Sequence, residues 1–193
     1  MLRIIFPWTI KGQQNANFYF YPECKSVPPR NFTKNGNILC RKGHFETTIG
    51  PWGKTFKISF DFELKEFKIS CSWRNLFEIS AEDENGFGSR FPSVFISCKD
   101  LIISSYVGTD NKFEDYKTTL EYKKNYHIEI AQKYHVHFGI LLNCIIINHK
   151  VEKCFLIKES KSFSKAYLFL SSPSFYGLYS RQGSFKNLAI QSL

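Results

Sequence analysis

The alternation of apolar and polar side chains between Phe56 and Leu64 constrains the fold of this chain more than any other feature. Five apolar residues occupy one parity of the run FKISFDFEL, and a lysine, a serine and two acids occupy the positions between them. Successive side chains of a β-strand point to opposite faces of its sheet. The run therefore predicts a strand with one face in the core and the other in solvent.

Comparable runs recur along the chain at intervals of roughly 8 to 12 residues, with glycine and proline turns between them. The 20 Phe and 10 Tyr residues strengthen this indication, because aromatic residues favour strands. The predicted strands lie at residues 17–21, 37–39, 44–49, 56–64, 67–71, 77–81, 94–98, 101–103, 126–130, 134–138, 141–147, 166–170 and 185–190. The first half of the stretch between Asp110 and Lys124 fits a short helix as well as a strand and is left unassigned. The pattern predicts an all-β domain of about a dozen strands, folded as a large antiparallel two-sheet sandwich or barrel.

The 193 residues are enough for one substantial core and too few for two independent ones. Residues 1–34 are the least regular part, and the proline pair at 28–29 excludes a helix or a central strand there. Asn35-Gly36 is a typical tight-turn dipeptide. We therefore expect a partly irregular N-terminal extension over residues 1–34 and one compact domain over residues 35–193.

No apolar run is long enough to cross a bilayer as a helix, and the longest, residues 138–147, has the size of one or two buried strands. The N-terminal segment carries a positive residue and a short apolar patch, but Pro7 interrupts the patch and Lys11 ends it. This pattern is shorter than a complete secretory signal. We expect no transmembrane segment, and a beginning that is either a mature start or a truncated signal.

The chain has six cysteines, which are Cys24, Cys40, Cys71, Cys98, Cys144 and Cys154. None of their spacings matches the paired pattern of zinc sites or thioredoxin-like motifs, which leaves disulfides or buried thiols. Cys144 and Cys154 lie at equal distances from His149, where a hairpin turn is expected to bring two strands together. The simplest connectivity pairs neighbours along the chain, joining Cys24 to Cys40, Cys71 to Cys98 and Cys144 to Cys154.

Two features predict a secreted or cell-surface glycoprotein. Disulfides form and persist in oxidising compartments. The sequon Asn31-Phe32-Thr33 is an acceptor for N-glycosylation at Asn31. The expected localisation is therefore extracellular.

The formal net charge of +9 and the sequence pI near 9.2 favour a polyanionic partner, such as a sulfated glycan or an acidic lipid. The lysines are interspersed with acids and apolar residues, so a solvated basic surface is the alternative interpretation. No motif of alternating aromatic and basic residues, typical of single-strand binders, is present. A specific nucleic-acid partner is therefore not expected.

Six segments in a fixed order carry a family resemblance, namely GKTFKISFDF, WRNLFEIS, NGFGSRFPSVFI, NYHIEIAQ, IIINHKV and GSFKNLAIQS. From Asn35 to Leu193 the chain resembles the laminin-G-like and concanavalin-A-like lectin and glucanase superfamily. The resemblance implies a jelly-roll sandwich of two curved sheets whose first and last strands pair. It also implies a concave face and rim loops that bind glycans, polysulfated chains or protein ligands, often with calcium.

The run from Glu78 to Glu82 is similar to the strand on which retaining glucanases of this superfamily place two glutamates around a central aspartate. Retaining hydrolysis needs a nucleophile and an acid about 5 to 5.5 Å apart, but Ser80 replaces the central group, so catalysis is not expected. Glu78, Ser80 and Glu82, with the nearby Arg90, remain candidate ligand-binding residues. The alternatives are an exposed acidic strand end and an arginine that ties a loop by hydrogen bonds. The histidine, asparagine and arginine set of the galectin-like branch is absent.

Two groups of residues are candidates for metal binding. Asp83, Asn85 and Asp110 offer the hard oxygen ligands that calcium prefers, although a solvated acidic loop has the same composition. Three histidines share one parity, as zinc ligands on a sheet do, and they are His127, His135 and His137. Three outward-facing histidines on a solvated sheet are the alternative, because no carboxylate or cysteine falls at a matching position.

Together these observations predict a non-catalytic extracellular binding module that recognises a glycan, a sulfated polysaccharide or an extracellular protein. The alternative is a structural subunit that packs against other chains in a larger extracellular or surface complex. A retaining glycosidase-like enzyme is the third hypothesis, and the serine at position 80 argues against it.

Overall fold

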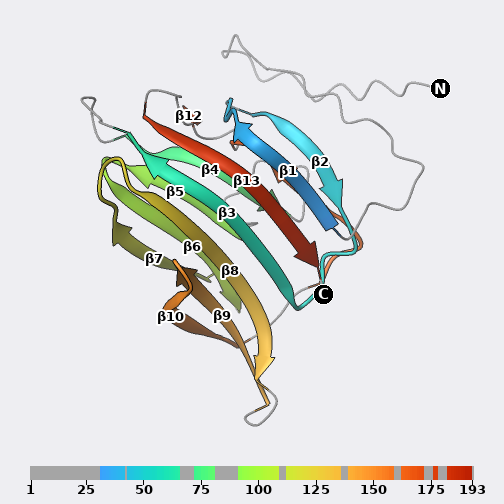
Figure 1. Ribbon diagram of the computed structural model, residues 1–193. Helices are drawn as coiled ribbons and strands as arrows, with labels where there is room; N and C mark the ends of the chain where they lie inside the picture. Colours follow the sequence, from blue (N-terminus) through green and yellow to red (C-terminus); the bar gives the residue numbers. More distant parts are fainter. Residues whose placement is uncertain are drawn as a thin grey trace, which may run out of the picture.

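The computed structural model describes residues 31–41, 43–65, 72–80, 91–108, 112–135, 139–158, 162–171, 176–177 and 182–192. Within these ranges the chain forms thirteen strands and no helix. The strands build two sheets packed as two layers (Figure 1), which confirms the predicted all-β, two-sheet sandwich. None of the described residues belongs to a helix long and apolar enough to cross a membrane.

The six-stranded sheet contains, in spatial order, β1 (Asn31–Ile38), β13 (Gly183–Ser192), β3 (Phe56–Leu64), β8 (Asn125–His135), β9 (Ile140–Ile147) and β10 (Lys150–Ile157). The seven-stranded sheet contains β2 (Phe45–Ile49), β11 (Ala166–Phe169), β4 (Arg74–Ser80), β5 (Ser93–Ser97), β6 (Asp100–Gly108) and β7 (Lys112–Thr119), with the short β12 (Tyr176–Gly177) beside β4. The first and last described strands, β1 and β13, pair in antiparallel fashion, as the family resemblance implies.

β3 carries the alternation from which the fold is predicted. Its five apolar side chains are at most 3% exposed, and its four polar side chains are half-buried or exposed. β13 pairs with one edge of β3 and β8 pairs with the other. The strand therefore lies inside the six-stranded sheet with the predicted phase, one face toward the core and one toward solvent.

Aromatic rings join the two sheets at Phe60. The Phe60 ring lies edge-to-face against Phe77 of β4, with centroids 5.4 Å apart, and against Phe185 of β13 at 5.5 Å. Phe77 and Phe185 stack on each other at 6.0 Å. Burial of one such side chain contributes about 1.5 to 3 kcal/mol, and edge-to-face geometry adds about 0.5 to 1.5 kcal/mol. This three-ring contact is therefore a main connection between the layers.

The Asn35-Gly36 dipeptide lies within a strand and does not form the predicted turn. β1 begins at Asn31, and its pairing with β13 shifts in register between Lys34 and Asn37. Gly36 has a φ of 72° at this shift. A left-handed glycine suits a β-bulge as well as a tight turn, so the dipeptide alone does not distinguish the two. The sandwich thus includes residues that the predicted boundary assigns to the extension.

Other segments also differ from the sequence prediction. The unassigned stretch contains β7, which pairs with β6. β7 is an edge strand in which only Tyr116 is buried among residues 114–119, so its hydrophobic pattern is weak. β8 runs unbroken to His135, where the sequence predicts two separate strands. The strands predicted at 17–21 and 67–71 lie outside the described residues.

The disulfide prediction is confirmed at one hairpin and wrong at Cys40. Cys144 of β9 and Cys154 of β10 are directly opposite each other and are joined by a disulfide. Cys98 is also disulfide-bonded, and Cys71 as its partner stays a prediction because it lies outside the described residues. Cys40 is a buried thiol that donates a hydrogen bond to the carbonyl of Leu76 at 3.2 Å. The expected bond between this cysteine and position 24 is therefore not formed.

Replacing Phe60 by alanine tests the connection between the sheets. We expect Phe60→Ala to lower the free energy of unfolding by about 3 to 5 kcal/mol, because it leaves a cavity between two other rings. Phe60→Leu keeps most of the volume and should cost less than half as much. Urea unfolding followed by tryptophan fluorescence measures both values, and a loss below about 1 kcal/mol for the alanine variant would contradict this account of the core.

Candidate functional site

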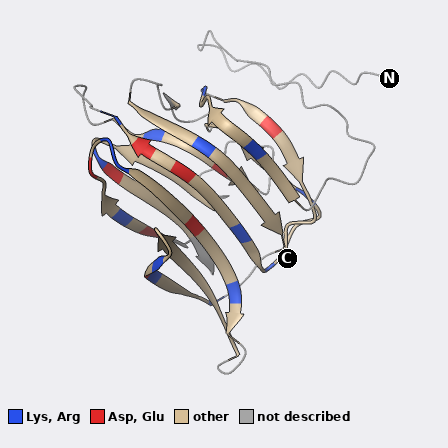
Figure 2. Cartoon of the chain, in the orientation of Figure 1, with Lys and Arg blue, Asp and Glu red and all other residues tan. Residues whose placement is uncertain are grey.

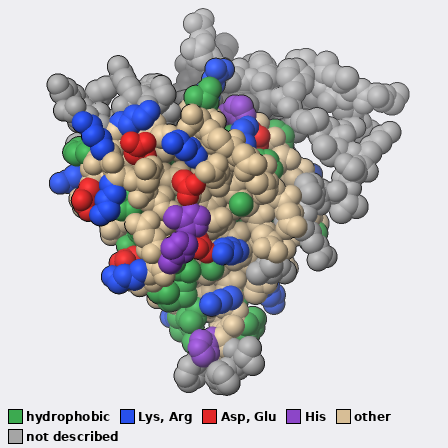
Figure 3. Space-filling view, in the orientation of Figure 1, with side chains coloured by type: hydrophobic (Ala, Val, Ile, Leu, Met, Phe, Trp, Pro, Cys, Tyr) green, Lys and Arg blue, Asp and Glu red, His purple; other side chains and the backbone are tan. Residues whose placement is uncertain are grey.

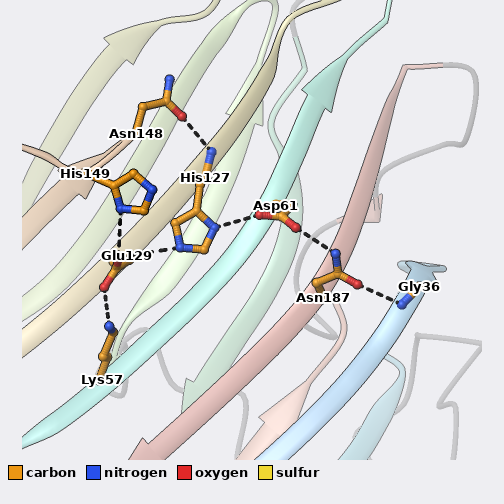
Figure 4. Close-up of polar contacts among 8 residues, drawn as sticks. All are labelled: Gly36, Lys57, Asp61, His127, Glu129, Asn148, His149 and Asn187. Atoms are coloured by element: carbon orange, nitrogen blue, oxygen red, sulfur yellow. Dashed lines mark hydrogen bonds and ion pairs between the residues drawn. The ribbon is translucent and has the colours of Figure 1, made fainter.

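A cluster of polar side chains occupies the outer face of the six-stranded sheet (Figure 4). We call it the polar cluster, and its members are Lys57, Asp61, His127, Glu129, Asn148, His149 and Asn187. Lys57 and Asp61 come from β3, and His127 and Glu129 from β8. Because the apolar residues of these two strands fill the core on the opposite parity, their polar residues gather on the solvent face.

The turn between β9 and β10 brings His149 to the cluster. The turn consists of Asn148 and His149, with φ values of 50° and 66°, as a type I′ hairpin requires. The Asn148 side-chain oxygen accepts a hydrogen bond from the backbone N–H of His127 at 2.9 Å, and the backbone N–H of Asn148 donates to the His127 carbonyl at 2.8 Å. The two imidazole rings stack with centroids 5.5 Å apart. The hairpin is thus attached to β8 at the cluster.

The Asp61 carboxylate of β3 accepts hydrogen bonds from side chains of both neighbouring strands, β8 and β13. One carboxylate oxygen accepts a hydrogen bond from His127 Nδ1 at 2.7 Å, and the other accepts from Asn187 Nδ2 at 2.7 Å. Asn187 has a φ of 53° at a register shift between β13 and β3. Its side-chain oxygen accepts from the backbone N–H of Gly36 at 2.9 Å. The hydrogen bonds therefore form one chain from β1 through β13 and β3 to β8.

Glu129 is the second carboxylate of the cluster. It accepts from Lys57 Nζ at 2.5 Å, and its other oxygen lies 3.5 Å from His127 Nε2 and 3.9 Å from His149 Nδ1. Its side chain is 13% exposed, whereas that of His149 is 81% exposed. A neutral imidazole has a single N–H, so only the doubly protonated ring of His127 donates to Asp61 and Glu129 together. Within the cluster the His149 ring is therefore accessible to solvent, whereas the Glu129 carboxylate is largely shielded from it.

Both carboxylates are held ionised by their neighbours. Burial acts to raise the pKa of Asp61, but hydrogen bonds from His127 and Asn187 outweigh it and lower that pKa below its ordinary value of 3.8. The hydrogen bond from Lys57 is the main reason that the pKa of Glu129 lies below 4.5. At neutral pH the cluster thus carries two negative charges beside one ammonium. Figure 2 shows the same intermixing of acidic and basic residues across this sheet.

An apolar surface adjoins the polar cluster on the same face. Ile146 of β9 is directly opposite Glu129 of β8, and directly opposed side chains share a face of the sheet. Val151 pairs with Ile146 in turn, and Leu156 pairs with Leu142 beyond the disulfide. Figure 3 shows histidines near the middle of this face, with hydrophobic side chains beneath them. Polar and apolar groups therefore lie side by side in the open.

The candidate ligand-binding residues of the sequence analysis lie elsewhere. Glu78 and Ser80 are on β4 of the seven-stranded sheet, and they are 9% and 3% exposed. All seven residues of β4 are buried, so the alternative of an exposed acidic strand end is wrong for Glu78. Glu82 and Arg90 lie outside the described residues. A ligand-binding role for these four residues stays a prediction.

The predicted zinc ligands are not brought together within the described residues, and the predicted calcium ligands lie outside them. Asp83, Asn85 and Asp110 lie outside the described residues, so calcium binding there stays a prediction. Within the described ranges no group of three or more His, Cys, Asp or Glu side chains could hold a metal ion. His127 and His135 lie eight residues apart on β8, which corresponds to roughly 26 Å along a strand. These two histidines therefore cannot share one zinc ion.

The sequence contained one usable signal for the polar cluster. Asp61 and His127 each lie on the polar parity of a predicted strand, and a hairpin centred on His149 was foreseeable. The alternation along a strand predicts that such residues face solvent. It does not predict which strands are neighbours in the sheet. The pairing of Asp61 with His127 across β3 and β8 comes from the tertiary structure.

Comparisons with known proteins show a similarity of fold only. No protein-family model matches the chain, and no curated protein is similar to it. Among solved structures it is similar to the receptor binding domain of botulinum neurotoxin D, with a TM-score of 0.54 and 10% identity over 84% of this chain and 44% of that one. The ligand binding domain of serotype D in complex with N-acetylneuraminic acid gives 0.52 and 11% identity over 84% and 42%. The chain thus spans under half the length of these structures.

Acid titration tests the electrostatics of the cluster. Because Asp61 and Glu129 are more acidic in the folded protein than in the unfolded chain, the unfolded chain binds more protons below about pH 4. The free energy of unfolding should therefore fall as the pH decreases through this range. We expect a smaller fall between about pH 4.5 and 2.5 in Asp61→Asn/Glu129→Gln, which lacks both titrations. Urea unfolding at each pH measures this, and equally steep curves for the two proteins would refute it.

Proposed function

We propose that this chain is a non-catalytic binding module that recognises a glycan at the polar cluster. The observation that carries the proposal is the chain of hydrogen bonds centred on Asp61, in which His127 and Asn187 hold the carboxylate in one position. Side chains fixed before binding lose little conformational entropy when a ligand arrives. The cluster therefore has the preorganisation that suits an uncharged ligand with many hydroxyl groups.

The chemistry of the surface suits a sugar. Hydroxyl groups need acceptors, which the half-exposed Asp61 carboxylate supplies, and donors, which Lys57 and the Asn187 amide supply. Sugar rings also have apolar C–H faces, and the neighbouring surface around Ile146 offers an apolar contact. The exposed His149 ring adds a flat surface at the rim. A ligand that is polar at its edges and apolar on its faces matches this arrangement.

Three further observations support this class of function. One of the similar structures is a ligand binding domain in complex with N-acetylneuraminic acid, which makes a sugar ligand a reasonable precedent for the fold. The family resemblance to laminin-G-like and concanavalin-A-like domains leads to the same ligand class. The Cys144–Cys154 disulfide and the exposed acceptor Asn31 support an extracellular location. Calcium at Asp83, Asn85 and Asp110 remains part of the proposal as a loop-bound ion.

A second candidate function is contact with another protein in an assembly. β10 is an edge strand, and its Val151 and Leu156 side chains are 58% and 50% exposed. Exposed apolar side chains on an unpaired edge favour association with another chain. The two candidate functions, glycan binding and association with another protein, predict different effects for a substitution on β10. Leu156→Ser, farther from the cluster along the β9–β10 hairpin, should weaken an assembly and leave sugar binding at Asp61 unchanged.

A glycan array followed by titration tests the proposed function. We expect Asp61→Asn to weaken binding of the selected glycan by at least about tenfold, or about 1.4 kcal/mol, because the charged acceptor at the centre of the cluster is lost. Asp100→Asn is the matched control, since Asp100 is also hydrogen-bonded to a neighbour, Thr119 Oγ1 at 2.7 Å, but lies on the other sheet. Its affinity should be that of the native protein.

Two outcomes would contradict the proposal. The first is that the native protein binds no glycan on an array that includes neutral, sialylated and sulfated chains. Equal losses in Asp61→Asn and Asp100→Asn would show that the cluster has no special role. Circular dichroism and thermal unfolding of both variants establish that each is folded before affinities are compared.

A further inference from the structure

A second surface feature lies at the end of β8, away from the polar cluster. It is a depression lined by Lys54, Tyr134, Gly139, Ile140, Leu141, Leu156, Ile157 and Lys158. β8 and β9 reach furthest toward the bottom of the view at this end of the six-stranded sheet (Figure 1). The depression is formed by the end of β8, the start of β9 and the end of β10, together with Lys54, which precedes β3.

The floor and one wall of the depression are apolar. Tyr134 of β8 is directly opposite Leu141 of β9, which is directly opposite Ile157 of β10. Leu141 and Ile157 are buried, whereas Tyr134 is 56% exposed. Three side chains in one row across antiparallel strands share a face of the sheet. An accessible aromatic ring thus stands beside a packed aliphatic floor.

This row belongs to the opposite face from the polar cluster. Tyr134 has the parity of the buried residues of β8, and Glu129 has the parity of the solvent face. Five residues also separate them along the strand, or roughly 16 Å. A ligand bound at the depression therefore does not need any group of the polar cluster.

The lysines at the depression have no acidic partner within the part of the chain that the structure describes. Lys54 and Lys158 are both exposed, and no acidic residue is among the lining residues. Lys57 in the polar cluster is paired with Glu129, but neither of these two lysines forms an ion pair with a described residue. Two like charges beside a low-dielectric apolar floor attract an anion more strongly than either charge alone.

The backbone that carries these groups is held in place. The Gln132 side chain donates a hydrogen bond to the Lys54 carbonyl at 2.7 Å, which ties that segment to β8 two residues before Tyr134. The Cys144–Cys154 disulfide joins β9 to β10, close to the Leu156 wall. The depression is thus a fixed feature of the sheet and its disulfide.

We propose that this depression binds an acidic saccharide, meaning a pyranose ring that carries a carboxylate or sulfate group. The ring stacks on Tyr134 and contacts the aliphatic floor, and the anionic group pairs with Lys54 and Lys158. Aromatic side chains recognise the apolar faces of flat ligands, and lysine is a mobile point charge that suits anions of varied geometry. The inference extends beyond the proposed function, because it concerns another site and a charged ligand.

Titration with four probes tests this site. The probes are a heparin-derived hexasaccharide, 3′-sialyllactose, uncharged lactose and a hexaglutamate peptide. We expect Lys54→Gln/Lys158→Gln to weaken binding of at least one acidic saccharide by about tenfold or more. The sulfated and carboxylated probes distinguish the two sources of the anion. Comparable affinity for the peptide would overturn the saccharide assignment, and binding of neither acidic saccharide would overturn the proposal.

A matched control separates this site from the general positive charge. Lys99 and Lys123 are also exposed and form no ion pair with a described residue, and Lys123 lies just before the start of β8. β8 has 11 residues, so Lys123 is about 35 Å from Tyr134. We expect Lys99→Gln/Lys123→Gln, with the same change in net charge, to alter affinity by less than about twofold. Equal losses in the two double variants would refute a specific site.

Salt dependence and an aromatic variant supply a further readout. Charge pairing is screened by salt, so the lysine double variant should bind with a weaker salt dependence than the native protein. Tyr134→Ala should lower affinity by a similar factor, about fivefold, at every salt concentration, and Tyr134→Phe should keep near-native affinity. Asp100→Asn, on the other sheet, should leave all these affinities unchanged. A site at the depression loses affinity in the lysine double variant whether or not Asp61→Asn weakens binding of the glycan selected for the polar cluster, so failure here is distinguishable from failure of the proposed function. Loss of acidic-saccharide affinity in Asp61→Asn with none in the lysine double variant would overturn the assignment to the depression.

Discussion

The phase of β3 is the constraint on which both the core and the polar cluster depend. Phe60 points between the sheets, where it meets rings from β4 and β13, and its neighbour Asp61 points to solvent beside His127. Because side-chain direction alternates along a strand, a slip of one residue would expose the first and bury the second. Burial of an unpaired carboxylate is costly, so only one register is compatible with this sequence. The same nine residues therefore specify the interior and the exposed face.

Irregular backbone completes the cluster that regular strands begin. Gly36, Asn148, His149 and Asn187 all have positive φ, a conformation that glycine and asparagine adopt more readily than other residues. Each of these positions aims a polar group along the sheet, at a bulge in β1, at the β9–β10 turn or at a register shift in β13. The hydrogen bonds that result cross four neighbouring strands. Local chemistry at a few residues thus turns a solvated sheet face into an ordered one.

The two candidate surfaces differ in how their charges are balanced. In the polar cluster Lys57 neutralises part of the charge of two carboxylates, so the proposed glycan would be held there mainly by hydrogen bonds. At the end of β8, Lys54 and Lys158 have no acidic partner among the described residues, which favours an anion. The net charge of +9 does not predict the local charge of either surface. Its distribution over the fold, and not its total, distinguishes the ligands that each surface suits.

The sequence by itself determined the phase of β3, the all-β sandwich and the disulfide-linked hairpin of β9 and β10, because these follow from local alternation, composition and short spacing. It led to Glu78 as a candidate site, yet β4 is buried along its whole length, and alternation does not reveal what covers a strand. The even number of cysteines likewise suggested a disulfide partner for Cys40, but its thiol donates a hydrogen bond to the Leu76 carbonyl. Only the tertiary structure brought Asp61 to His127 and Asn187, which lie 66 and 126 residues away in the chain. The packing of the whole core decides which distant strands are neighbours, so contacts between them cannot be obtained from any one stretch of sequence.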